Sequence, residues 1–109
     1  MLHTRVDKGV APIIYLEGEV DLDCTETLRW VVSDAVRGSD QAVLDFAGVR
    51  FIDSSGAGVF VRLCLDLRAQ GILLRARNLS PAVEDVFAML KVRELVGDAA
   101  FIEPQAKAV

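Results

Sequence analysis

The chain has 109 residues, of which 52% are hydrophobic and 26% are charged. This is ample apolar material for a folded core, which excludes a disordered or collagen-like chain. The net charge is -4 and the twelve basic residues are scattered, which argues against nucleic acid as a direct partner. No apolar run approaches the ~20 residues that span a bilayer, and the N-terminal MLHTRVDKG lacks the apolar segment of a signal peptide. We expect a cytoplasmic protein that does not contact membranes. No linker-like stretch divides the chain, which predicts a single domain over residues 1–109.

Cys24 and Cys64 stand far apart and form no CxxC pair or zinc-like cluster. Neither a disulfide framework nor a metal site is therefore indicated, and no motif calls for a cofactor. Each cysteine falls within an apolar helical stripe. We expect both to be small buried hydrophobic residues, since free cysteine is among the most buried residue types.

The first part of the chain is predicted to form two strands and a helix. Beta-branched and aromatic residues favour strands over residues 3–7 and 12–20. Residues 23–38 then place apolar side chains on one helical face, at Cys24, Leu28, Val31, Val32, Ala35 and Val36. Asp23 is the expected N-cap of this helix, with Glu26 three positions on as in a capping box.

The rest of the chain alternates strands and helices. Strands are predicted over residues 41–46, 72–77 and 99–103, and helices over residues 56–70 and from Pro81 onward. Ser80 before Pro81 is a standard N-cap pair, and Val83, Val86, Phe87 and Leu90 form the apolar stripe that follows. The tail PQAKAV, residues 104–109, is either a stub of helix or frayed.

This order of elements predicts an α/β fold with a mixed sheet of four to five strands, an initial hairpin and three to four packed helices. In such folds, ligands and partners meet the ends of strands and the loops that follow them. The stretch FIDSSGAGVF, residues 51–60, lies at such a place. It puts Asp53, Ser54 and Ser55 between a strand and a helix.

An exposed serine at such a turn is typical of the hydrolase nucleophile elbow, but the elbow pattern is GxSxG and residues 53–57 read DSSGA. The single histidine, His3, stands near a terminus, so no base for a serine is evident and we do not expect an enzyme. Neither GxxxxGK[ST] nor GxGxxG occurs. An acidic run lacks adjacent His or Cys ligands and is either a solvated loop or a binding surface; it comprises Glu17, Glu19, Asp21 and Asp23.

A serine at a helix N-terminus fits the motif better. The first amides of a helix lack internal partners and the helix dipole favours negative charge, so Asp53 or Ser54 is expected to cap the helix while Ser55 points outward. The same geometry suits a phosphate group. Phosphorylation of Ser55 would add about two negative charges beside Asp53 and, if the loops meet, Asp21. Such a change would act as a binding switch.

The run LDFAGVRFIDSSGAGVFVRL, residues 44–63, resembles the core signature of STAS domains, specifically of bacterial anti-sigma factor antagonists. Upstream, LEGEVDLDCTETLRWVV is similar to the second strand and first helix of the family. Downstream, ILLRARNLSPAVEDVFAMLKV resembles its fourth strand and third helix. The resemblance covers about residues 10–96 and implies a STAS-type fold with the element order given above.

The resemblance implies a partner-switching mechanism. The unphosphorylated antagonist binds an anti-sigma factor that is also a serine kinase, which frees a sigma factor. The kinase, with its own ATP and magnesium, phosphorylates the antagonist and releases it, and a serine phosphatase resets the cycle. By position in the motif, the phosphorylated serine carries over to Ser55, and the expected partner-binding residues are Asp21, Asp53, Ser54, Gly56 and Ala57. A monomer or weak homodimer without a cofactor is expected.

Other interpretations stay open. STAS domains also serve as structural modules of stress-sensing scaffolds and as accessory subunits of membrane transport systems. Ser55 could instead be a cap in a relative that has lost the switch. Ala57 stands where leucine is common in the family, and the C-terminal helix of the family is truncated or absent at residues 104–109.

Four side chains near the helices carry further expectations. We expect Met89, Leu90 and Val92 to lie in the core. Trp30 lies outside the best apolar stripe of its helix. It is either partly exposed, where it could contact a partner, or wedged against the sheet.

Overall fold

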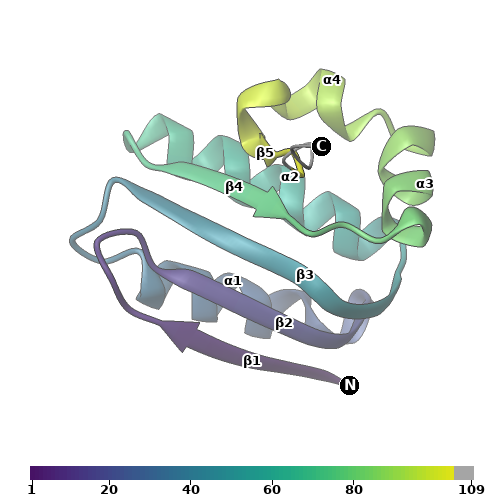
Figure 1. Ribbon diagram of the computed structural model, residues 1–109, viewed down its shortest axis with the longest axis horizontal. Helices are drawn as coiled ribbons and strands as arrows, with labels where there is room; N and C mark the ends of the chain where they lie inside the picture. Colours follow the sequence, from purple (N-terminus) through teal and green to yellow (C-terminus); the bar gives the residue numbers. More distant parts are fainter. Residues whose placement is uncertain (105–109) are drawn as a thin grey trace, which may run out of the picture.

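The structure is a computed structural model in which residues 1–104 are described. Its centre is one five-stranded sheet in the order β1-β2-β3-β4-β5, shown in Figure 1. The strands are β1 (Leu2–Asp7), β2 (Ile13–Val20), β3 (Gln41–Ile52), β4 (Leu73–Arg77) and β5 (Phe101–Ile102). β1 pairs antiparallel with β2 and the other neighbours are parallel, which confirms the predicted mixed sheet with an initial hairpin.

Four α-helices connect the strands, with α1 and α2 lying behind the sheet in Figure 1. They are α1 (Thr25–Ala35), α2 (Ser54–Ala69), α3 (Pro81–Met89) and α4 (Val92–Val96), accompanied by the short 3-10 helices η1 (Leu22–Cys24) and η2 (Asp98–Ala100). Ser80 caps α3 through a bond from the amide of Val83, as predicted. The sequence did not predict α4. The predicted tail at residues 104–109 lies, apart from Pro104, outside the described residues.

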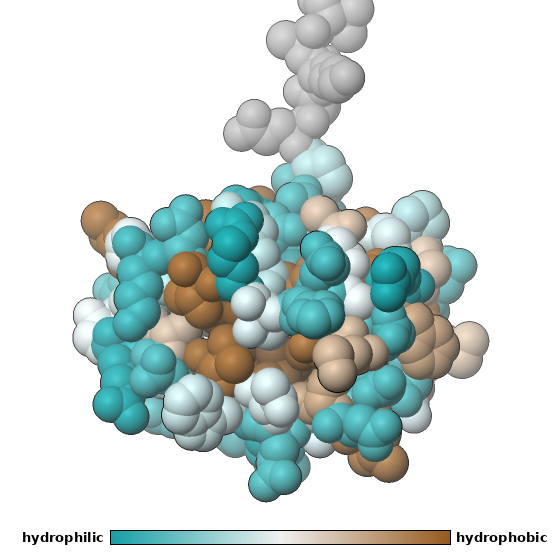
Figure 2. Space-filling model, turned by 90° about the horizontal axis from the view of Figure 1, so that it is seen from below, coloured by the Kyte–Doolittle hydropathy of each residue, from teal (hydrophilic) through white to brown (hydrophobic). Residues whose placement is uncertain are grey.

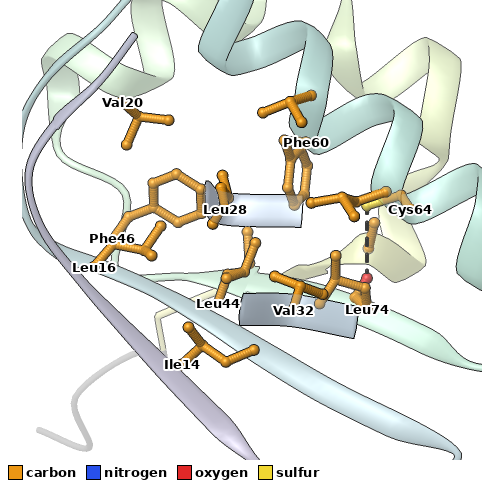
Figure 3. Packing of buried hydrophobic residues seen from close by; sticks show 14 of the residues in the cluster. Ile14, Leu16, Val20, Leu28, Val32, Leu44, Phe46, Phe60, Cys64 and Leu74 are labelled. Carbon is orange, nitrogen blue, oxygen red and sulfur yellow. Dashed lines mark hydrogen bonds between the residues drawn. The ribbon is translucent and has the colours of Figure 1, made fainter. Parts of the chain in front are cut away.

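The core lies between the sheet and its helices. Alternate residues of the three central strands are buried on this side: Ile14, Leu16, Val20, Ala42, Leu44, Phe46, Leu74 and Ala76. Figure 3 shows several of them with Phe60 of α2 and Leu28 and Val32 of α1. Phe46 meets the ring of Phe60 edge-on at 6.0 Å, and Phe60 stacks on Phe87 at 5.4 Å. This cluster anchors α2 on the middle of β3.

Asp45 is a buried charge on the opposite face of β3, where the residue is 4% exposed. Its carboxylate accepts bonds from the amide of Ala47 at 2.9 Å, from Arg77 at 2.7 Å and from the Asn78 side chain at 3.0 Å. Burial raises the pKa of Asp45, but these hydrogen bonds and the Arg77 charge outweigh burial and hold the pKa below its ordinary value. Asp45 therefore ties β3 to the end of β4.

The structure confirms the burial of the cysteines and of Val92 but not the cap at Asp23 or the burial of Met89. Both cysteines are buried, as predicted. Asp23 does not cap the first helix, because it lies within η1; the N-cap position of α1 is Cys24, which makes no side-chain cap bond. Asp21 caps η1, and its carboxylate accepts the amide of Asp23 at 3.1 Å. Val92 is in the core, but Met89 is 78% exposed and Leu90 is partly exposed.

The exposure of Met89 and Leu90 follows from a turn. Lys91 has a left-handed backbone conformation, with φ of 55°, which ends α3 and redirects the chain into α4. Met89 and Leu90 therefore lie at a corner between two helices. Trp30 is 73% exposed on α1, which decides between its two expected positions in favour of exposure.

Candidate functional site

The turn between β3 and α2 is fixed by two contacts. Asp53 has an extended backbone and caps α2, its carboxylate accepting the amide of Gly56 at 2.9 Å. Gly56 packs directly on the end of β2, since a Cβ built on it would lie 2.1 Å from the carbonyl oxygen of Val20. The amide of Asp53 also donates to that carbonyl, at 3.3 Å. Only glycine at position 56 lets the helix begin this close to the strand.

The two serines occupy the first two positions of α2, directly after the cap. Because Asp53 is the cap, the alternative that Ser54 caps the helix is wrong. Ser54 is exposed and Ser55 is half-buried, so the more exposed of the two serines is Ser54, not Ser55 as expected. Within residues 1–104, no protein group forms a hydrogen bond with either hydroxyl. In the described part of the chain, neither hydroxyl is thus engaged by another protein group.

A second acidic residue lies next to this turn. Asp21 directly follows β2 and caps η1, while its own amide donates to the sulfur of Cys24 at 3.3 Å. Burial raises the pKa of the Cys24 thiol, and the charges of Asp21 and Asp53 both add to this shift. The amide of Asp53 donates to the carbonyl of Val20, the residue before Asp21, so Asp21 and Asp53 lie at the same end of the sheet.

The acidic run of the sequence is divided by the fold. Glu17 and Glu19 belong to β2 and not to a loop. Glu19 binds Arg50 of β3 at 2.7 Å and the N-terminal ammonium at 2.6 Å, which together lower its pKa to about 2. The solvated-loop interpretation therefore applies only to Asp21 and Asp23, which follow β2.

An apolar groove adjoins the serines and was not predicted. It has a volume of about 310 Å³ and lies between α2 and α4. Ser54, Ala57, Gly58, Val61, Arg62, Leu65, Leu90, Val92 and Leu95 line it. Leu65 and Leu95 are 39% and 56% exposed. The sequence carried a signal for this groove, because apolar residues cover more of α2 than one buried face needs.

The remaining predicted contact residues lie beneath this surface. Gly56 and Ala57 are buried, Gly56 under β2 and Ala57 at the floor of the groove, where it is 1% exposed. A direct role for either in binding stays a prediction.

Metal-binding side-chain clusters and membrane-spanning helices are both absent from the described residues. Within residues 1–104, no group of three or more His, Cys, Asp or Glu side chains is arranged to hold a metal ion. In that same part of the chain, no helix has the length and apolar character required to cross a membrane.

With its fold and site described, the chain can be compared with known proteins. A sequence model of the STAS domain matches residues 2–106, and the chain belongs to the STAS domain family. No curated protein sequence matches it.

Solved structures share the fold at low identity. The anti-sigma factor antagonist SpoIIAA in its unphosphorylated form has a TM-score of 0.74 and 22% identity, over 94% of this chain and 89% of that chain. The Bacillus cell fate determinant SpoIIAA in its phosphorylated form has a TM-score of 0.67 and 21% identity, over 96% and 92%. SLC26A9 has a TM-score of 0.78 and 16% identity, over 88% of this chain but 18% of that chain. The predicted STAS-type fold is thus confirmed.

Proposed function

We propose that this protein is an anti-sigma factor antagonist whose binding is switched off by phosphorylation of Ser55. Its unphosphorylated form binds an anti-sigma factor with serine kinase activity in the cytoplasm and thereby frees a sigma factor. A serine phosphatase reverses the modification. The protein itself is a regulator that catalyses no reaction, and a single STAS domain over residues 1–109 suffices for this role.

One observation carries the proposal: the serine that precedes Gly56 lies at a helix start locked against β2, in a STAS fold shared with an antagonist known in phosphorylated and unphosphorylated forms. The amides of the first helical turn have no intrahelical acceptor, and the cap uses the amide of Gly56. The amides of Ser54 and Ser55 remain available to phosphate oxygens. The fold therefore tolerates the modification.

The same phosphate changes the surface that a partner meets. It adds about two negative charges next to Asp53 and near Asp21. Ser55 is also the neighbour of Ser54, which lines the apolar groove. A partner that covers the groove with apolar side chains would have to bury this charge, which is unfavourable without paired cations. Phosphorylation then weakens binding without unfolding the protein.

The direct test mixes the protein with candidate kinases, ATP and magnesium, and maps the phosphate by mass spectrometry. We expect modification of Ser55, a Ser55→Ala variant that binds the kinase but is not released by ATP, and a Ser55→Asp variant that binds weakly. Ser54→Ala is the matched control, because the serines are neighbours and Ser54 is the more exposed. Phosphate on Ser54 alone, or normal release of Ser55→Ala, would place the switch elsewhere.

The groove gives a second, independent test. Leu65→Asp puts a charge on the groove wall at a site that is 39% exposed, whereas Leu22→Asp puts one on η1 at a site that is 68% exposed. We expect the first variant to lose kinase binding by tenfold or more and the second to keep it. Equal losses, or none, would show that the groove is not the contact surface.

A second candidate function is that of a STAS module in a membrane transport system or a stress-sensing scaffold. The TM-score of 0.78 with SLC26A9 favours it as much as the likeness to SpoIIAA favours the first. Neighbouring genes discriminate between them. A histidine-kinase-like ATPase and a sigma factor support the antagonist, and a set of transporter genes supports the module.

A further inference from the structure

Strand β1 leaves one edge of the sheet open. It is the first strand of the order β1-β2-β3-β4-β5 and pairs on one side only, with β2. Natural edge strands are usually protected by proline, lysine, a bulge or a very short length. The six residues LHTRVD contain neither proline nor lysine, their charged Arg5 and Asp7 are exposed on the face away from the core, and their register with β2 is unbroken. The edge is therefore competent to pair with another strand.

Two hydrogen bonds identify which backbone groups point outward. The amide of Glu19 donates to the carbonyl of Met1 at 3.4 Å, and the amide of Val43 donates to the carbonyl of Pro12 at 2.9 Å. The first bond makes Met1 and Glu19 a hydrogen-bonded pair, and such pairs recur at every second residue of an antiparallel ladder, so the odd-numbered residues of β1 bond to β2. The second bond agrees, because it directs the even-numbered residues of β2 toward β3 and leaves the odd-numbered ones to bond β1. The N–H and C=O groups of Leu2, Thr4 and Val6 then face the open edge.

The side chains beneath this edge are apolar. Leu2, Val6 and Val31 of α1 are half-buried and pack on the core from this side. Figure 2, which views the molecule from below Figure 1, shows apolar residues gathered in a hollow on this side of the molecule. A cleft of about 500 Å³ lies beside Leu2, and its lining includes Asp21 and Asp23 as well as Cys24. Thr27 lines this cleft and also lies beside the exposed Trp30. An open strand edge and an incompletely covered apolar layer thus coincide.

We propose that β1 pairs antiparallel with β1 of a second copy of this chain, centred on Thr4, so that two sheets join into one. In this register Thr4 faces Thr4, and Leu2 faces Val6 of the second copy. All three residues present free backbone groups, so each facing pair exchanges two N–H to O=C bonds. Leu2 and Val6 also place apolar side chains opposite each other on the side of the helices.

Charge and length favour this register over its neighbours. Centring the pair on Arg5 would set two guanidinium groups directly opposite each other, which is unfavourable. Centring it on Val6 would leave Leu2 unpaired and extend the ladder past Asp7, where β1 ends. In the Thr4 register, His3 faces Arg5 of the second copy and no two carboxylates or guanidinium groups meet.

The proposed dimer keeps the other surface of the molecule open. The groove between α2 and α4 is assembled on the part of the chain that packs around β4 and β5, whereas β1 is the opposite edge of the sheet. Each copy can thus present its own groove and its own Ser55. The dimer is an interaction beyond the proposed switch and does not depend on it.

Light scattering after size exclusion, from micromolar to millimolar protein, measures the association. We expect the wild type to reach twice the mass of one chain, and Thr4→Pro to raise the dissociation constant at least tenfold. Thr4→Pro removes a donor that faces the open edge, whereas the control Arg5→Pro removes one that bonds β2 and should lower the melting temperature more. A wild type that stays monomeric at millimolar concentration overturns the proposal.

Cross-linking tests the register in folded protein even if a proline variant unfolds. Thr4→Cys should form an intermolecular disulfide under oxidised glutathione, because paired Cα atoms lie about 5.5 Å apart in such a position. Val6→Cys should not, since two copies of residue 6 would be separated by about four residues of strand, roughly 13 Å. Wild type controls for the buried Cys24 and Cys64. A cross-link through Val6→Cys, or a dimer that gives none through Thr4→Cys, overturns the proposal.

Discussion

Gly56 is the residue on which the position of α2 depends most directly, and its replacement by alanine tests that dependence. A Cβ at position 56 would lie 2.1 Å from the Val20 oxygen and 2.9 Å from the Val20 carbonyl carbon, where ordinary contacts begin at 3.4 Å. The obstacle is backbone at the end of a central strand. It cannot rotate away as a flexible side chain would. The start of α2 must therefore move by more than 1 Å from β2.

The cost of the clash in Gly56→Ala is partly offset by the higher helix propensity of alanine. Alanine stabilises a helix interior by about 1 kcal/mol relative to glycine. Overpacking of a close-packed site costs typically 1–3 kcal/mol and occasionally more, and this overlap is severe. We expect Gly56→Ala to lower the free energy of unfolding by about 2 kcal/mol net. For a domain of this size, that corresponds to a melting temperature roughly 10 °C lower.

Gly58 supplies a matched control in the same helix. It is exposed, and a Cβ built on it meets no atom within 4 Å. Gly58→Ala should therefore gain helix propensity without a clash and raise the stability by up to about 1 kcal/mol. Thermal and urea unfolding, followed by circular dichroism, measure both variants. If Gly56→Ala is as stable as Gly58→Ala, α2 does not rest on the Val20 carbonyl and the described turn is wrong.

Three further predictions follow from buried side chains. Because the folded pKa of Asp45 is lowered, its contribution to stability is present above about pH 4 and is lost as the pH falls through the lower folded value. Asp45→Asn should cost about 2 kcal/mol at pH 7 by urea unfolding, and the difference from wild type should shrink in acid. Burial raises the pKa of Cys64 to about 12, so in folded protein a thiol reagent should modify the slightly more exposed Cys24 first, and faster labelling of Cys64 would contradict its placement. Ala57→Leu has the groove to extend into and should cost less than about 1.5 kcal/mol, whereas a melting point as low as that of Gly56→Ala would mean that the groove floor is closed.

Elements with a clear hydrophobic period could be predicted from the sequence. The alternation in residues 12–20 and the stripe on α1 are local signals, because each side chain repeats the environment of its neighbours two or three to four positions away. The cap at Ser80 is local in the same sense. Most boundaries differed by up to three residues, but the third strand was predicted to end at residue 46 and continues to Ile52.

The features that the sequence did not predict depend on turns or on distant partners. Lys91 adopts a left-handed conformation, which at helix ends is usually found at glycine or asparagine. A lysine at this position therefore did not predict the end of α3. In the sequence, Asp45 is a charged residue within an apolar strand. Its partner Arg77 lies 2.7 Å away on another strand. Such pairs follow from the order of the strands and not from spacing along the chain.

The two serines show where local rules and the site diverge. Capping rules alone left Asp53 and Ser54 as alternatives, and the structure gives the cap to Asp53. Exposure alone would then choose Ser54 as the phosphate acceptor, whereas position in the STAS motif chooses Ser55, which is half-buried. Ser55 is the serine next to the fixed contact of Gly56 with β2, so a phosphate there adds its charge close to the end of β2. Ser54 lines the groove, so a phosphate there would also meet a partner bound in it, and exposure does not separate the two serines as switches. The choice of Ser55 therefore rests on its position in the STAS motif, and mapping of the phosphate tests it.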